Sequence, residues 1–379
     1  MKIKSPFKEP VLVTKPYLPP LKEYTKRLSE LWDNQWLTNN GPVLQRFHNK
    51  LADYLSIPEE NMSLSCNGTL ALEIIFQVMG LSGGEVITTP FTFVATAHAL
   101  KRIGAIPVFA DIDPETLCLD PDSAEKMITS RTKAIVPVHV YGHPCDVSAF
   151  DALGKKYGLK IIYDAAHAFG VEINGKSIAS YGHAGMFSFH STKLFHSIEG
   201  GLLVFNDPGL RQKADQIKNF AILSETECVD VGTNAKMNEM QALMGEMNIE
   251  VISELIDKRQ AIYNVYSDFF TGTDIKLLGV PAISHGLTIK HNYAYCPVLF
   301  KDFETRERVY NELKLYNVFS RRYFYPLLTE FIPYKDSASL GSLSVAKYSA
   351  DRILTLPTCQ TLPLNDVKKI AGLVIKICK

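Results

Sequence analysis

The sequence predicts an α/β protein built around a mainly parallel sheet. In the middle of the chain, short apolar runs alternate with helical patterns of about ten residues, as in βαβ units. These runs are apolar at successive positions, which is typical of parallel strands buried on both faces. Apolar residues make up 46% of the chain and charged residues 21%, an ordinary globular composition.

The predicted elements follow one another at regular spacing. The first strand should stop at Pro90, which has no N–H group to donate to a sheet. The predicted strands are Glu85–Thr89, Ile106–Ala110, Ala134–Val140 and Lys160–Tyr163. The predicted helices between them are Phe91–Lys101 and Ala149–Tyr157.

The pattern of apolar and polar residues changes after Asn234. Residues 237–266 show apolar side chains near helical spacing and predict one or two long helices. Shorter elements rich in Pro, Tyr and Arg follow beyond Thr271. We therefore expect a large domain over residues 1–255, with the N-terminal segment included, and a smaller one over 256–379.

The bulk properties exclude several classes of protein. Forty basic residues balance forty acidic ones, so no global field attracts a nucleic acid or an anionic membrane. No apolar run reaches the length of a membrane span, and the first nine residues lack the apolar core of a secretory signal. Seven scattered cysteines without a CxxC pair predict reduced thiols, no metal site and a cytoplasmic protein.

One candidate segment for chemistry is IIYDAAH, residues 161–167. An apolar strand ends in Asp164, and His167 follows three residues later. Ligands of open α/β sheets bind beyond the carboxyl ends of strands, so Asp164 is expected to point into a site. By itself this pattern fits an acidic turn or a helix cap equally well.

A second segment, FSFHSTKLFHSIEGG, contains Lys193 at its centre. Leu194 and Phe195 follow the lysine, so its amine is expected to be partly desolvated and available as a neutral nucleophile. The alternative is a solvated surface lysine without a catalytic role. The nearby hydroxyls of Ser188, Ser191 and Thr192 and the glycines at 200–201 make that alternative the weaker one.

Two further segments are weaker signals. In SCNGTLALE a helix begins at Gly68 or Thr69, and free N–H groups at such a helix start bind phosphate well. In PFTFVAT closely spaced aromatic residues follow a strand, and one ring could stack on a planar cofactor, although most such rings are core.

Together the four segments predict a site for pyridoxal phosphate (PLP). This cofactor needs a lysine partner, an anion cradle, a stacking ring and a carboxylate against its pyridine nitrogen. All four residue types follow strands of the same βαβ region.

At this point the motifs resemble a known family. NGTLAL, TPFTFVAT, YDAAHAFG, SFHSTK and EGG, in this order, are similar to the DegT/DnrJ/EryC1/StrS sugar aminotransferases among the fold type I PLP enzymes. The resemblance runs from about Thr14 to Leu328. It implies a large domain with a mainly parallel seven-stranded sheet and a smaller C-terminal α/β domain.

The resemblance also implies roles for the residues. Lys193 would form the Schiff base with the cofactor and move the proton, Asp164 would pair with the pyridine nitrogen, and His167 would sit against the ring. The remaining cofactor-binding residues would be Gly68, Thr69 and Ser188 at the phosphate, Phe93 on the ring face, and Asn234. The last matches the family asparagine that reaches the phosphate of the neighbouring subunit, which implies a homodimer with shared active sites.

The C-terminal part offers substrate candidates. Arg321, Arg322, Tyr323 and Tyr325 match the family's basic and aromatic stretch and are expected at the nucleotide diphosphate, with a solvated turn nearly as good an interpretation. The chain departs from the family at His48 and at Leu328. Because of the second departure, the family's substrate contacts are not assigned to residues near Leu328.

The resemblance implies a ping-pong transamination. L-Glutamate would give its amino group to the cofactor, and a nucleotide-linked keto sugar would receive it. The SFHSTKLFHSIEGG stretch is most similar to members that convert dTDP-4-keto-6-deoxy-D-glucose to dTDP-4-amino-4,6-dideoxy-D-glucose for surface polysaccharides such as O-antigen. The alternatives are a 3-keto nucleotide-sugar aminotransferase and a sensor or scaffold without turnover, which the Lys193 and Asp164 pair argues against.

Overall fold

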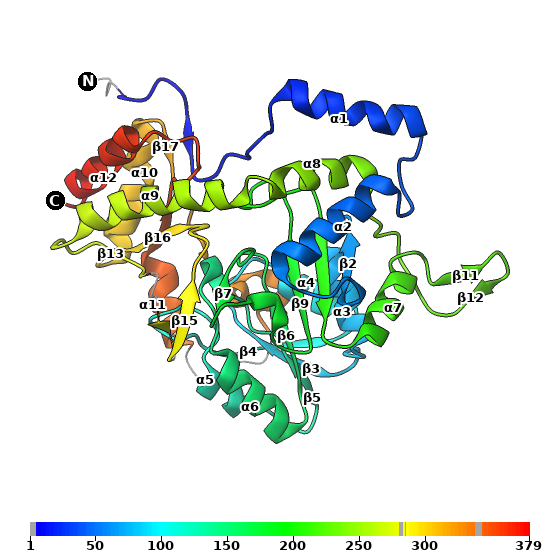
Figure 1. Ribbon diagram of the computed structural model, residues 1–379. Coiled ribbons are helices and arrows are strands. Elements are labelled where there is room, and N and C mark those ends of the chain that lie inside the picture. The colour runs from blue at the N-terminus through cyan, green and yellow to red at the C-terminus, as the bar shows by residue number, and fades with distance from the viewer. Residues whose placement is uncertain (1–4, 280–282, 285, 338–342) are drawn as a thin grey trace.

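A seven-stranded sheet forms the centre of the molecule (Figure 1). The computed structural model describes residues 5–279, 283–284, 286–337 and 343–379. Strand order is β2-β10-β9-β6-β5-β3-β4, and only β10 runs against its neighbours among these seven strands. The strands are β2 (Met62–Ser65), β3 (Glu85–Thr88), β4 (Ile106–Phe109), β5 (Thr132–Ile135), β6 (Lys160–Asp164), β9 (Ala184–Ser188) and β10 (Gly201–Phe205). The predicted mainly parallel sheet of seven strands is confirmed.

Both faces of this sheet are covered by helices. Val86, Ile162 and Leu203 belong to the apolar cluster of α3 (Gly68–Val78) and α7 (Pro208–Ile217). Their chain neighbours Ile87, Ile161 and Leu202 belong to the cluster of α2 (Pro42–Leu55), α6 (Val147–Tyr157) and α8 (Glu239–Ile249). Successive side chains of a strand point to opposite faces, so the unbroken apolar runs are explained by burial on both sides.

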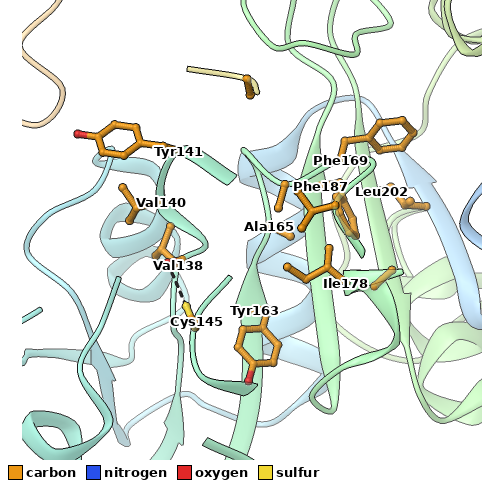
Figure 2. Close-up of a cluster of buried hydrophobic side chains, with 14 of the residues drawn as sticks. Val138, Val140, Tyr141, Cys145, Tyr163, Ala165, Phe169, Ile178, Phe187 and Leu202 are labelled. Atoms are coloured by element: carbon orange, nitrogen blue, oxygen red, sulfur yellow. Dashed lines mark hydrogen bonds between the residues drawn. The ribbon is translucent and has the colours of Figure 1, made fainter. Parts of the chain in front are cut away.

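Aromatic side chains fill the core beneath the carboxyl end of the sheet. Figure 2 shows Phe169 and Phe187 within this cluster. Phe169 stacks on Phe195 with ring centroids 4.3 Å apart, and Phe189 meets Phe195 edge to face at 4.8 Å. Because these rings flank the segments that contain His167 and Lys193, the core anchors both segments from below.

The C-terminal part has its own sheet and apolar cluster. Antiparallel strands β13 (Lys276–Leu277), β16 (Cys296–Leu299) and β18 (Ile353–Leu356) pack with α9 (Ile252–Phe270), α10 (Phe303–Leu315) and α12 (Leu364–Cys378). The N-terminal segment lies here too, because Phe7 joins this cluster and β1 (Val11–Leu12) pairs with β17 (Val318–Phe319). The domain boundary at residue 255 stays a prediction.

Smaller elements complete the fold. The hairpin of β11 (Ile222–Ser224) and β12 (Glu227–Cys228) extends away from the body beside α7 (Figure 1). A four-stranded sheet contains β14 (Ile283–Ser284), β15 (Leu287–Lys290), β7 (Glu172–Ile173) and β8 (Lys176–Ser177). The other helices are α1 (Leu21–Asn34), α4 (Ala95–Arg102), α5 (Pro121–Lys126) and α11 (Ser344–Arg352). The 3₁₀ turns are η1 (Glu59–Asn61), η2 (Val140–Gly142), η3 (Ile178–Ser180), η4 (Leu328–Glu330) and η5 (Ile332–Tyr334).

Two predicted elements have different bounds in the structure, and a third prediction agrees with it. The strand predicted to run to Val140 is wrong, because β5 ends at Ile135 and Val138 makes only a single bridge to Asp164. Pro137 lacks an N–H group and cannot continue the ladder. The helix predicted from Phe91 begins only at Ala95, after a turn in which the Phe91 N–H donates to Thr89 Oγ1. Residues 237–266 form two helices, as predicted.

Two kinds of structural feature are absent from the described residues. No helix among them is both long enough and apolar enough to cross a bilayer. Nor does the described part of the chain bring three His, Cys, Asp or Glu side chains together in a group that could hold a metal ion.

Candidate active site

A cavity of about 950 Å³ opens at the carboxyl end of the central sheet. Residues that follow the carboxyl ends of four parallel strands line it, as expected for an open α/β sheet. They include Gly68 after β2, Phe93 after β3, Asp164 at the end of β6 and Lys193 after β9. The structure therefore brings together four segments that are far apart in the sequence.

Asp164 lies at the buried inner wall of the cavity. Its Oδ2 accepts a hydrogen bond of 2.6 Å from Thr96 Oγ1, and its Oδ1 accepts one of 3.0 Å from the Ala166 N–H. Burial raises the pKa of this carboxyl, while both hydrogen bonds and the charge of Lys193 oppose that rise. A carboxylate held in this way can stabilise a proton on a ring nitrogen.

Lys193 lies in the loop between β9 and β10, and its side chain lines the same cavity. Burial lowers the pKa of its amine, and the positive charge of Arg321 lowers it further, while Asp164 and Tyr323 act in the opposite direction. A lowered pKa increases the neutral fraction of the amine, which is the form that attacks a carbonyl carbon. The predicted desolvation of this lysine is therefore present.

The His167 ring is held in one tautomer. Its Nδ1 accepts the Tyr141 N–H at 3.1 Å, so the neutral ring carries its proton on Nε2. Burial lowers the pKa of this imidazole well below its ordinary range, and Lys193 adds to the effect. Phe324 stacks parallel to the ring at 6.0 Å, and Tyr295 packs at 4.8 Å. The ring can therefore act as a neutral N–H donor.

The first turn of α3 forms an anion site beside these groups. Asn67 caps the helix by accepting the Leu70 N–H at 2.9 Å, which leaves the amides of Gly68 and Thr69 without a partner in the described part of the chain. A Cβ at Gly68 would lie 3.0 Å from the Cβ of Ser188. This close approach explains the glycine and places the Ser188 hydroxyl next to the helix start.

Phe93 supplies an aromatic face at the cavity. It lies just before α4 and is 56% exposed, so most of its ring is open to a ligand. A half-exposed phenyl ring is unfavourable in water and becomes favourable when a planar group stacks on it. The lining thus contains an amine, a carboxylate, helix-start amides and an open ring, which is the set of groups that PLP requires.

The substrate candidates of the C-terminal part divide into two sets. Arg321 and Tyr323 line the cavity, and their side chains contact each other. Tyr325 does not line it, because its ring covers the guanidinium of Arg306 at 4.2 Å. Arg322 also faces elsewhere, pairing with Glu307 and lying 3.8 Å over the ring of Tyr310. Of the four candidates, only Arg321 and Tyr323 line the cavity.

Three other sites marked in the sequence lie outside the cavity. Asn234 is exposed, forms a bridge with Asn219 close to the β11–β12 hairpin and does not line the cavity. His48 donates from Nε2 to the Met62 carbonyl at 3.1 Å and lines a separate hollow. Leu328 packs with Ala97, Phe109 and Tyr334 in a small apolar cluster. The departure from the family at Leu328 is thus one of core packing.

Sequence reasoning assigned no role to several residues of the site. Thr96 lies within a segment that was singled out, but its bond to Asp164 joins positions 68 residues apart. His190 and Glu199 flank Lys193 and line the cavity, where they approach each other to 3.4 Å. Arg102 pairs with Glu73 at the rim. No local pattern reports such contacts, because they depend on how distant strands and helices meet.

Comparisons with known proteins agree with this geometry. The model of the DegT/DnrJ/EryC1/StrS aminotransferase family matches residues 21–375. The chain is 40% identical to dTDP-4-amino-4,6-dideoxy-D-glucose transaminase of Shigella dysenteriae, over 97% of this chain and 99% of the relative. It is 34% identical to DesI, whose crystal structure was determined in the presence of its TDP-sugar product, with a TM-score of 0.91 over 99% of this chain and 94% of that one.

A more distant structure shares the fold as well. The Streptococcus pneumoniae chain Spr1654, solved in its PLP form, superposes with a TM-score of 0.88 at 22% identity. The superposition covers 97% of this chain and 98% of that one.

Proposed function

The chain belongs to the DegT/DnrJ/EryC1/StrS aminotransferase family and is a PLP-dependent nucleotide-sugar aminotransferase, and we propose that its acceptor is dTDP-4-keto-6-deoxy-D-glucose. The product would be dTDP-4-amino-4,6-dideoxy-D-glucose, a precursor of surface polysaccharides. The observation that carries this proposal is the full-length similarity to a transaminase named for that sugar, combined with an intact Lys193 and Asp164 pair in one cavity.

The proposed amino donor is L-glutamate. When bound, PLP supplies a protonated ring that withdraws electrons from the carbon that bears the amino group. Lys193 Nζ takes the proton from the donor Cα, for which its lowered pKa suits it. Asp164, held by Thr96, would keep a proton on the ring nitrogen, and His167, whose Nδ1 is occupied by the Tyr141 N–H, would offer its Nε2–H to the cofactor.

The other lining residues would bind and orient the reactants. The amides of Gly68 and Thr69 and the hydroxyl of Ser188 would hold a phosphate at the start of α3, where the helix dipole favours an anion. Phe93 would cover one face of the cofactor ring. Arg321 forms no ion pair with a carboxylate among the described residues, so its charge remains available for an anionic group of the donor or of the nucleotide sugar.

We also propose a homodimer with shared active sites. Asn234 is exposed next to a protruding hairpin that carries exposed apolar side chains. Large exposed apolar residues at a protruding element are typical of an interface. In a mixing experiment, Lys193→Ala and Asn234→Ala chains should regain part of the activity when exchanged, because one site of the mixed dimer would then carry both native residues. No recovery in a verified mixed dimer contradicts the shared site.

A cytoplasmic location completes the proposal. All seven cysteines are free in this structure, and free thiols are typical of proteins in a reducing compartment.

The test is an absorption spectrum of the purified protein with PLP, before and after L-glutamate. A visible band that gives way to a near-ultraviolet band upon addition of L-glutamate supports the donor and the first half-reaction. Keto sugars are then added one at a time. Recovery of the visible band with dTDP-4-keto-6-deoxy-D-glucose, but not with a 3-keto sugar, supports the acceptor.

Other outcomes contradict parts of the proposal. Recovery with the 3-keto sugar alone would make the chain a 3-keto nucleotide-sugar aminotransferase. A visible band that no amino donor changes would favour the sensor or scaffold.

A further inference from the structure

The loop that carries Lys193 is closed at its base. This lysine loop, residues 189–200, begins and ends with backbone hydrogen bonds from Phe189 N to the Gly200 carbonyl (2.8 Å) and from Ser197 N to the Phe189 carbonyl (2.9 Å). Leu194 and Phe195 are buried beneath it in the aromatic core. The core side of the loop is therefore well held, and the cavity side needs separate support.

His190 organises the cavity side of the lysine loop. Its Nδ1 accepts the Thr192 N–H at 3.2 Å and lies 2.8 Å from Thr192 Oγ1, while its carbonyl accepts the Lys193 N–H at 2.9 Å. Because the backbone donor occupies Nδ1, the ring carries its proton on Nε2. The imidazole is thus locked with an N–H pointing away from the turn that it stabilises.

The carboxylate of Glu199 lies near that nitrogen. His190 Nε2 lies 3.4 Å from Glu199 Oε1, and both side chains line the cavity. The contact joins the residue three positions before Lys193 to the residue six positions after it. Ile198, next to the glutamate, has a positive φ of 70°, which a β-branched residue rarely adopts. The backbone accepts this unfavourable conformation where Glu199 turns toward the histidine.

A stability role does not account for this pair. The two side chains are 42% and 48% exposed, and even charged pairs that are this exposed contribute little to stability. Neither side chain forms an ion pair with a third residue in the described part of the chain. The aromatic core already holds the opposite side of the loop. What the pair adds is a link across the cavity face of the lysine loop.

From this geometry we infer that His190 and Glu199 are positioning residues that keep Lys193 Nζ aligned with the reacting carbon. They act through the backbone around Lys193. The inference rests on the proposed aminotransferase function of the same site. Small displacements of a reacting group have large effects on rate, so a modest loosening of the loop should be measurable.

The experiment compares Glu199→Ala, Glu199→Gln, His190→Asn and the double variant His190→Asn/Glu199→Gln. Asp151→Asn is the matched control, because it removes an exposed ion pair with Lys155 (2.6 Å) on α6. One readout is hydrogen exchange of the peptide 189–200 in the cofactor-free protein. The other is the single-turnover rate with L-glutamate in the PLP-loaded protein, together with the visible band and the thermal midpoint.

We expect Glu199→Ala to react about tenfold more slowly while the band and the thermal midpoint stay near those of the wild type. Exchange in the lysine loop should rise. Glu199→Gln, which keeps a polar side chain of the same size next to His190, should recover much of the rate. The double variant should be no slower than its slower parent, because the two residues act as one unit.

Several outcomes would overturn the inference. These are unchanged exchange and rate in Glu199→Ala, additive losses in the double variant, or a loss confined to cofactor binding. If the wild type itself fails to react with L-glutamate, the proposed donor fails, whereas the exchange readout still decides whether the pair holds the loop.

Discussion

Two regions of the molecule each hold a lysine withdrawn from water. Lys193 lies at the cavity beyond the carboxyl end of the sheet, and Lys218 follows α7 beside the edge strand β2. Burial lowers the pKa of both amines. By this measure alone either lysine could carry chemistry.

Their partners differ. Lys218 Nζ lies 2.6 Å from Asp215 Oδ1 and 2.7 Å from Ser63 Oγ, so its ammonium is neutralised and bonded. Lys193 has no such bond among the described residues, and the Asp164 carboxylate of the same cavity accepts its hydrogen bonds from Thr96 and Ala166 instead. Desolvation marks a functional lysine only where a direct partner is missing and a cavity is present.

The largest expected effect comes from removing each lysine. In the cofactor-loaded protein, Lys193→Ala should slow the half-reaction with L-glutamate by about 10²–10⁴-fold, since it loses the general base. Its visible band should be lost while the fold is retained. Lys218→Ala should keep the rate. Stopped-flow absorbance measures both, and an equal loss of rate in a folded Lys218→Ala protein would break the comparison.

The carboxylates near the two lysines should separate in the same way. Asp164→Asn should lower the rate roughly 10²–10³-fold, because the ring proton loses its anionic partner. Asp215→Asn should leave the rate unchanged and lower the free energy of unfolding by about 1–3 kcal/mol, since Lys218 loses its counter-ion. Urea unfolding and single-turnover kinetics on the two variants decide this point.

The hydroxyl groups beside the two carboxylates give a smaller contrast. Thr96→Val removes the 2.6 Å hydrogen bond to Asp164 and should slow the reaction about tenfold, by raising the pKa of that carboxyl further. Ser63→Ala removes the hydroxyl between Lys218 and Asp215 and should cost about 1 kcal/mol of stability without slowing the reaction. Single-turnover kinetics and urea unfolding measure both variants. A Thr96→Val protein that reacts as fast as the wild type would contradict the prediction.

The smallest expected effect is on the pH dependence of stability, and the two lysines should share it. Burial lowers each pKa in the folded protein, so between that pKa and the ordinary value of 10.5 the unfolded chain binds more protons. Both groups should therefore make the free energy of unfolding of the cofactor-free protein increase as the pH rises toward 10.5. Lys193→Met and Lys218→Met should each weaken this rise. A steeper rise in either variant would contradict the lowered pKa.

Much of the site could be predicted because each role depends on a short local motif. Asp164, His167 and Lys193 follow apolar strands, and strand ends of a parallel sheet share one edge, so the spacing already implied proximity. Gly68 was marked by a helix start, which provides free amides wherever it occurs. The role proposed for Asn234 needs a second subunit, and no local pattern of one chain describes a contact between two chains.

Local sequence patterns predicted the central strands and helices, the parallel sheet and the residues that bring reactive groups to its edge, because apolar periodicity and helix starts are local properties. The tertiary structure alone decided which groups meet. It bonded Thr96 to Asp164, turned Tyr325 onto Arg306 and away from the cavity, and left Lys193 without the partner that Lys218 has. Such pairings depend on the relative placement of distant elements, which long-range packing sets and no local pattern encodes.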